Sequence, residues 1–304
     1  MDIPTAVPKL ADKLYTPLSV SQKSLLAVLC LIAGVLALSM RYVPGEVVRI
    51  VWGLVVAAVF LALTFSLRQR PSLRRYWELP FAFFVLSLFV VLDNTIPTFV
   101  ATFLLRNPPI PGNPLASTIG GSVVVQVVEV VITLVVVVGL TKAAGGNLGS
   151  ISLRWGLFGR AMIIGIAGFV FFYVLFVIHP ASQFFPMHGA MTTSHVLALT
   201  PALLMVVLGN GFLEELIFRG LFLRKYNAVF GPYLANAVQA AIFALAHVGV
   251  SYTPFALLFI VLIVFPLGLL LGYLMRSSNG IVAGSLFHAG ADIPIYLTFF
   301  SYVS

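Results

Sequence analysis

Nine apolar runs, each about as long as a bilayer is thick, constrain this chain more than any other feature of its sequence. They lie at 24–42, 47–67, 79–100, 118–140, 157–178, 199–222, 231–249, 254–275 and 280–300. A helix of roughly 20 apolar residues crosses a bilayer, and it satisfies its backbone hydrogen bonds within one segment. The sequence therefore predicts an all-α, polytopic membrane bundle of about nine transmembrane helices.

Composition supports this fold class and excludes several kinds of site. Hydrophobic residues make up 61% of the chain and charged residues 9%, with a mean hydropathy of +1.09. The single cysteine, Cys30, lies within an apolar run, which excludes a disulfide framework and a cysteine metal site. A net charge of +8 would suggest nucleic acid in a soluble protein, but in a membrane protein it reflects orientation. We therefore expect membrane lipids as partners and no nucleic acid.

The basic residues predict how the chain is oriented. If the N-terminus is cytoplasmic, 14 of the 17 Lys and Arg residues fall in the N-terminal arm or near the even-numbered loops. Only Arg41, Arg49 and Arg106 fall outside. Because cytoplasmic segments carry an excess of Lys and Arg, we predict a cytoplasmic arm at 1–23 and an external C-terminus. The expected location is a prokaryotic plasma membrane.

A pair of adjacent carboxylates, Glu214 and Glu215, interrupts the sixth apolar run. Charge inside a membrane is expensive, so such a pair is a functional hypothesis by default. On a helix Glu215 has Arg219 four residues later, which predicts a structural ion pair. Glu214 has Phe218 at that spacing and points to a different face, which leaves it as the free carboxylate. The alternative is that all three charged groups form a snorkelling cluster near a helix end.

Two later runs each bring a histidine into apolar surroundings. Phe243 precedes His247 by one helical turn, and His288 precedes Asp292 by the same spacing. A single histidine in a membrane span is usually an interhelical hydrogen-bond donor. Three spans that each carry ionisable groups, with Ala and Gly residues that permit close helix approach, indicate a shared site.

The fourth run contains a further polar pair, Gln126 and Glu129, three residues apart on one helix face. We interpret the pair as an interhelical hydrogen bond, with a second polar site as the alternative.

Taken together, these motifs resemble the CPBP family of intramembrane proteases, which includes the CAAX prenyl-protein endopeptidases and bacteriocin self-immunity proteins. The elements are Glu214-Glu215-x-x-x-Arg219, Phe243-x-x-x-His247 and His288-x-x-x-Asp292. The likeness covers about residues 150–300. It implies a protease core at 151–304, preceded by a transmembrane extension at 24–150.

The resemblance implies an intramembrane endopeptidase that cleaves a hydrophobic or prenylated peptide or protein. Glu214 and His247 would activate a water, and His288 with Asp292 would line the oxyanion site. The family usually has Asn where this chain has Asp292. Since an ionised carboxylate cannot donate a hydrogen bond to an oxyanion, we expect Asp292 to orient His288 instead.

Other functions and mechanisms stay open at this point. Glu214, His247 and His288 could form a two-histidine, one-carboxylate zinc site, although the chain has no His-Glu-x-x-His element. We favour water activation without a cofactor. A non-catalytic scaffold or an immunity-type protein is the non-enzymatic alternative. A transporter is disfavoured because the two halves show no internal repeat. The sequence leaves the oligomeric state open.

The predicted spans also raise a problem of depth. Glu214 would lie roughly 15 Å from the inner surface and His247 roughly 24 Å, at 1.5 Å per residue. The two side chains can meet only if one of their helices is tilted, broken or shifted.

Overall fold

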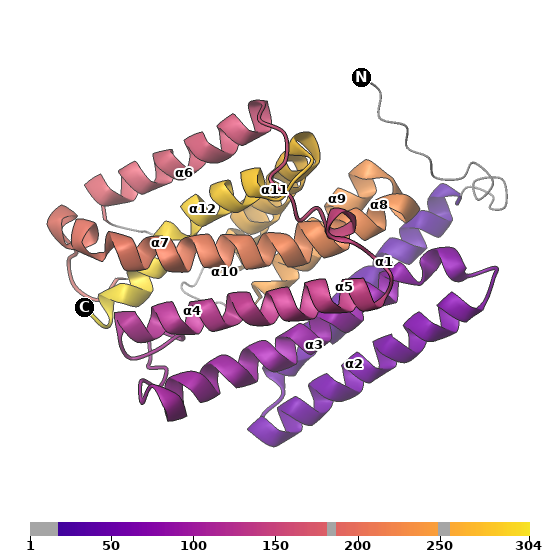
Figure 1. Cartoon of the computed structure of the whole chain (residues 1–304), viewed down its shortest axis with the longest axis horizontal. Helices are drawn as coiled ribbons and strands as arrows, with labels where there is room; N and C mark the ends of the chain where they lie inside the picture. The colour runs from indigo at the N-terminus through magenta and orange to yellow at the C-terminus, as the bar shows by residue number, and fades with distance from the viewer. Residues whose placement is uncertain (1–17, 181–186, 249–255) are drawn as a thin grey trace.

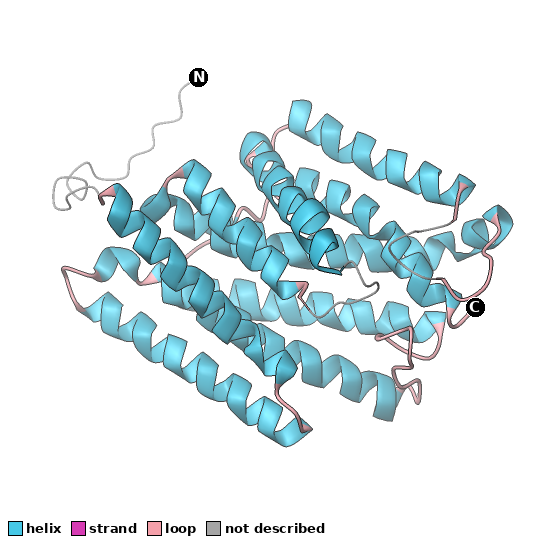
Figure 2. Ribbon diagram, turned by 180° about the vertical axis from the view of Figure 1, so that it is seen from behind, coloured by secondary structure: helices cyan, strands magenta, loops and turns pink. Residues whose placement is uncertain are grey.

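The computed structural model describes residues 18–180, 187–248 and 256–304. Most of the predicted N-terminal arm, residues 1–17, lies outside these ranges. The described chain forms helices and no β-strand. The helices run side by side along the long axis of the molecule, with α6 and α12 towards one side and α2 and α3 towards the other (Figure 1). From behind, helices joined by loops make up the whole described chain (Figure 2). The prediction of an all-α bundle is confirmed.

All nine predicted runs are mainly helical where the structure describes them; residues 249, 254 and 255 of the seventh and eighth runs lie outside the described ranges. The α-helices are α1 (Val20–Leu38), α2 (Glu46–Gln69), α3 (Glu78–Phe99), α4 (Ile119–Thr133), α5 (Gly139–Ala143), α6 (Arg160–Ile178), α7 (Thr193–Glu215), α8 (Arg224–Phe230), α9 (Pro232–Ala246), α10 (Ala256–Phe259), α11 (Phe265–Ser278) and α12 (Val282–Ser301). Within the described ranges, 7 helical stretches are long and apolar enough to cross a membrane. The other two predicted spans became α9, which is short, and α12, which carries His288 and Asp292.

The sixth predicted run differs most from the structure. Helix α7 does not end near residue 222 but continues through a π-helical segment, Leu216–Leu223, into α8. The chain then turns at Gly231, whose φ of 77° suits a residue without a Cβ. Pro232 starts α9, where its missing N–H leaves no hydrogen bond unmade. The result is a helical hairpin with a tight turn.

This hairpin resolves the problem of depth. Glu214 precedes Gly231 by 17 residues and His247 follows it by 16. At 1.5 Å per residue both lie roughly 25 Å from the turn, so they share one level of the bundle. The predicted mismatch arose because the sixth helix was ended too early, and neither helix has to be broken or shifted.

Helix α12 packs closely against α7 and α6 through small residues. A Cβ added at Gly211 of α7 would lie 2.7 Å from the backbone oxygen of Ser285 and 2.8 Å from the nitrogen of Ala289. Such contacts need glycine, because no side-chain atom fits between the two backbones. The expectation of close helix approach around the histidine motif is confirmed.

The N-terminal helices share a hydrophobic core with α7–α9. Phe83 of α3 makes edge contacts with Phe222 and Tyr226, at centroid distances of 5.2 and 6.2 Å. Beside this contact, the Lys225 ammonium lies 2.6 Å from a Glu78 carboxylate oxygen. Residues 24–150 are therefore packed directly on the helices that carry the motifs.

Candidate active site

A fully buried ion pair between Glu215 and Arg219 lies beside the site. Arg219 Nη1 lies 2.8 Å from Glu215 Oε1, and both side chains are 0% exposed. The guanidinium also donates to the Gly268 carbonyl at 3.3 Å and stacks 4.2 Å from the centre of the Phe243 ring. The pair expected from the four-residue spacing is thus present. Its position in the protein interior argues against a snorkelling cluster at a helix end.

Glu215 also orients His288. The Nδ1 atom of His288 lies 3.0 Å from Glu215 Oε1. Because a carboxylate accepts, Nδ1 carries the hydrogen, and Nε2 faces the rest of the site. Asp292 Oδ1 lies 3.7 Å from Nε2, beyond hydrogen-bonding distance. The hydrogen bond that orients His288 therefore comes from Glu215, where the sequence had suggested Asp292.

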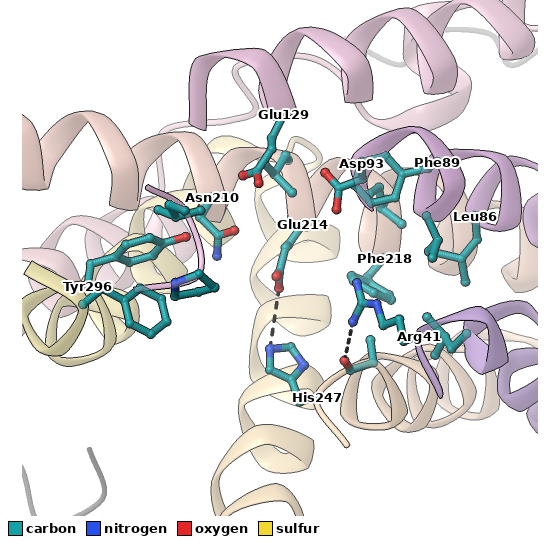
Figure 3. A pocket seen from close by; sticks show the side chains of 18 residues that line it. Arg41, Leu86, Phe89, Asp93, Glu129, Asn210, Glu214, Phe218, His247 and Tyr296 are labelled. Carbon is teal, nitrogen blue, oxygen red and sulfur yellow. Dashed lines mark hydrogen bonds and ion pairs between the residues drawn. The ribbon is translucent and has the colours of Figure 1, made fainter. Parts of the chain in front are cut away.

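Glu214 faces both histidines. Its Oε2 atom lies 3.6 Å from Nε2 of His288 and 3.9 Å from Nε2 of His247. Within the described part of the chain, this oxygen has no hydrogen-bond partner. The side chain is 20% exposed, whereas its neighbour Glu215 is 0% exposed. The two adjacent carboxylates therefore differ as expected: Glu215 is paired with an arginine, whereas Glu214 faces histidines. Figure 3 shows Glu214 directed towards His247.

His247 occupies the end of α9, as the first residue beyond the helix. Its Nδ1 atom lies 2.9 Å from the Phe243 carbonyl oxygen. Since a carbonyl only accepts, Nδ1 carries the hydrogen and the lone pair of Nε2 points towards Glu214. The Phe243 ring contacts both histidines, at centroid distances of 4.6 Å to His247 and 5.5 Å to His288. The Phe243 ring therefore packs against both histidines and also stacks on the Arg219 guanidinium.

An amide that the sequence analysis missed lies beside Asp292. Asn210 Nδ2 donates to Asp292 Oδ2 at 2.9 Å. Asn210 precedes Glu214 by four residues and shares its helix face, and this spacing could have revealed it. The structure therefore places an amide donor beside Asp292, supplied by α7.

The cluster lies between two cavities of different character. One cavity, of about 220 Å³, is lined by polar and charged side chains together with apolar ones. Its polar lining residues are Arg41, Asp93, Glu129, Asn210, Glu214, His247 and Tyr296 (Figure 3). The other, of about 200 Å³, is mainly apolar and is bounded by aromatic residues that include Phe172, Phe176 and Phe259. His247 lines both cavities.

The two polar residues of α4, Gln126 and Glu129, behave differently: one forms an interhelical hydrogen bond and the other lines a polar cavity. The Tyr296 hydroxyl donates to Gln126 Oε1 at 3.0 Å, which is the expected interhelical hydrogen bond. Glu129 instead lines the polar cavity opposite Glu214, as does Asp93 of α3. Arg41, Asp93 and Glu129 were visible as charged residues in the sequence. Their convergence depends on how helices far apart in the chain pack, which no local spacing reveals.

The zinc alternative named Glu214, His247 and His288, and the structure brings these three side chains together. However, among the described residues no group of three or more His, Cys, Asp and Glu side chains is placed so that it could hold a metal ion. Zinc coordination by Glu214, His247 and His288 therefore stays an alternative, which hydrolysis with and without chelator tests.

Comparison with known proteins supports the resemblance. Residues 196–293 match the family described as type II CAAX prenyl endopeptidase, Rce1-like. The matched segment runs from α7 into α12 and contains all three motifs. No curated protein and no solved structure matches the chain. With its apolar helices the chain is an integral, multi-pass membrane protein, and its segment 196–293 is similar to type II CAAX prenyl endopeptidases.

Proposed function

We propose that this protein is an intramembrane endopeptidase in which Glu214 and His247 activate the water that attacks a peptide bond. One observation carries the proposal. A free carboxylate faces the Nε2 atoms of two histidines from two other helices, at one level of a membrane-length hairpin. General bases act best when held close to the proton that they accept, in a site that shields the reaction from bulk solvent.

The first step is proton transfer from water. A water between Glu214 and His247 gives one proton to Glu214. Its other hydrogen is donated to the lone pair of His247 Nε2, and this hydrogen bond orients the water. Its oxygen then attacks the peptide carbonyl carbon to give a tetrahedral oxyanion. The proton held by Glu214 passes to the leaving nitrogen, the C–N bond breaks, and a carboxylic acid and an amine are released.

The second requirement is a donor for the oxyanion. His288 donates through Nε2 when both of its nitrogens carry hydrogen, and the carboxylates of Glu215 and Asp292 balance that charge. Asn210 has a second amide hydrogen besides the one given to Asp292. We assign Asp292 the role of holding Asn210 towards the site. Preorganised donors of this kind typically contribute about 10²–10³-fold in rate.

The two cavities support a hydrophobic or lipid-bearing substrate. The apolar cavity borders His247 and His288 with aromatic and aliphatic side chains, which suits a prenyl group or a large apolar side chain. The polar cavity on the other side of His247 suits the peptide backbone and water. We therefore propose prenylated or otherwise hydrophobic peptide segments as the substrate class.

We further propose that the N-terminus is cytoplasmic and the membrane is a prokaryotic plasma membrane. The unequal distribution of basic residues supports this orientation. Two of its three exceptions form hydrogen bonds within the protein. Arg41 Nη1 donates to the Ala246 carbonyl at 2.9 Å, and Arg49 Nε donates to the Val43 carbonyl at 3.1 Å.

The experiment is hydrolysis by purified protein reconstituted in lipid. Substrates are a prenylated C-terminal peptide and a panel of transmembrane peptides, each with and without chelator. We expect Glu214→Gln to reduce kcat by about 10²–10⁴-fold without loss of fold. Glu46→Gln makes the same chemical change on an exposed turn of α2 and should match wild type.

Three outcomes would contradict the proposal in different ways. Full activity of Glu214→Gln would exclude Glu214 as the base. Chelator-sensitive hydrolysis that zinc restores would replace the mechanism with the zinc alternative. No hydrolysis of any peptide, with wild type and Glu214→Gln alike in cells, would favour the non-catalytic scaffold or immunity-type protein.

A further inference from the structure

The 3-10 turn Ser39–Tyr42, which follows α1, contacts the backbone on both sides of His247. Arg41 Nη1 donates to the Ala246 carbonyl at 2.9 Å, and the Tyr42 hydroxyl donates to the Val248 carbonyl. These carbonyls belong to the residues immediately before and after His247. A segment more than 200 positions away in the sequence therefore holds the backbone that carries a proposed catalytic group.

The need for such contacts follows from the position of His247. Helix α9 ends at Ala246, and His247 is its C-cap residue, whose N–H donates to the Ala244 carbonyl at 3.1 Å. The last carbonyls of a helix have no partner within it, and a cation placed there is favourable. Arg41 meets both conditions by bringing a guanidinium to the Ala246 carbonyl. The contact thus provides a hydrogen-bond partner for a carbonyl that would be unpaired at the helix end, next to a functional side chain.

The same arginine faces the proposed reaction. Arg41 lines the polar cavity together with Glu214 and His247, and its side chain reaches across to Ala246 (Figure 3). It is the one Lys or Arg among the described residues that line this cavity. A contact that served only to join α1 to α9 could lie anywhere along the two helices. The contact of Arg41 instead lies at the end of α9, where the backbone sets the position of the His247 imidazole.

We propose that Arg41 and Tyr42 are positioning residues that hold His247 Nε2 at the correct distance from Glu214. The inference rests on the proposed peptidase function. It also makes the helices that precede the family-matched segment part of the active unit. Displacement of a reacting group by about 1 Å can lower a rate by 10²-fold, so removal of these contacts should be visible in catalysis.

Kinetics of four variants test the proposal on a prenylated peptide in lipid. We expect Arg41→Met to lower kcat by about 10–100-fold with little change in KM, since the contacts act on His247 and not on the substrate. Arg41→Lys keeps a cationic donor and should restore part of the rate. Tyr42→Phe removes one hydroxyl donor and should lower kcat several-fold. Arg49→Met is the matched control, because Arg49 lies on α2 and donates to the Val43 carbonyl, not to the backbone around His247, and it should match wild type.

A different result is expected if Arg41 only stabilises the fold and has no effect on the reaction. In that case Arg41→Met would lower the melting temperature and the yield while kcat per folded molecule stayed at the wild-type value. That result, or a rise in KM alone, would overturn the positioning role. Wild type that hydrolyses nothing would instead remove the proposed function on which the inference rests.

A measurement without activity tests the geometry itself. In a Cys30→Ser background, Tyr42→Cys combined with Val248→Cys should cross-link in membranes with a short bis-maleimide. The control pair combines Arg49→Cys with Val248→Cys and should react less, because Arg49 lies on the next helix and contacts Val43. Equal reaction of both pairs, or none at positions 42 and 248, would refute the placement of this turn beside His247.

Discussion

Removal of the guanidinium at Arg219 is the perturbation whose magnitude the structure constrains best. In Arg219→Ala, the Glu215 carboxylate loses a partner at 2.8 Å in a position that is 0% exposed. Breaking a buried pair from one side typically costs about 3–5 kcal/mol, because the remaining charge stays out of water. The stacking of Arg219 on Phe243 and its bond to the Gly268 carbonyl are lost as well. We therefore expect a loss at the upper end of that range.

The assay is thermal melting in detergent, with the yield of monodisperse protein as a second measure. A loss of this size corresponds to a fall in Tm on the order of 10 °C. Arg224→Ala is the matched control, because Arg224 is an exposed arginine on the same helix, and its melting curve should overlay that of wild type. The double variant Arg219→Ala, Glu215→Gln removes the unpaired charge and should recover part of the stability. The recovery stays partial because the contacts of Arg219 with the Phe243 ring and the Gly268 carbonyl are still lost.

The refuting result is direct. If Arg219→Ala melts with wild type, the ion pair contributes nothing that the remaining contacts cannot replace. If the double variant is less stable than Arg219→Ala, the damage does not come from an unpaired Glu215. Either result would end the interpretation of this pair as a support for the site.

Three further predictions concern packing, chemistry and topology. Gly284→Ala would bring a Cβ within 2.7 Å of Glu215 Oε2, so we expect lower stability and activity, measured by melting and hydrolysis. Asp292→Asn retains an oxygen that can accept from Asn210, so its kcat should stay within about tenfold of wild type; a loss as large as that of the base variant would give the carboxylate a direct role. A reporter fused after Ser304 should be translocated and one at the N-terminus should stay inside; a cytoplasmic reporter at the C-terminus would contradict the orientation drawn from the basic residues.

Length and local spacing made much of this architecture predictable. Runs of about 20 apolar residues identified the helices, because a bilayer leaves few other ways to satisfy a backbone. The four-residue spacing from Glu215 to Arg219 identified the ion pair for the same local reason. Glu214 and the two histidines were selected by their ionisable chemistry in apolar surroundings.

What escaped the sequence depends on contacts between distant helices. The sixth span was predicted to end at residue 222, yet Lys225 beyond it is buried beside Glu78 of α3 and the helix continues past it. The partner of His288 was misassigned because Asp292 lies at helical spacing, whereas Glu215 lies on another helix. Arg41 approaches Ala246 across 205 positions of sequence, a separation over which no periodic pattern carries information.

The π-helical segment Leu216–Leu223 gives the hairpin an unusual tolerance to a change in chain length. A π-helix packs more residues into each turn than an α-helix, and single π-turns often lie at functional sites. One residue deleted from this segment could be absorbed by a return to ordinary α-helical winding, with the hairpin still folded. The turns on its N-terminal side would then keep their orientation relative to α9, because the π-turn had held the extra residue without changing the register of the flanking helix. Such a deletion variant would fold with Glu214 still facing His247, so the length of this helix and the direction of its functional side chain are separable.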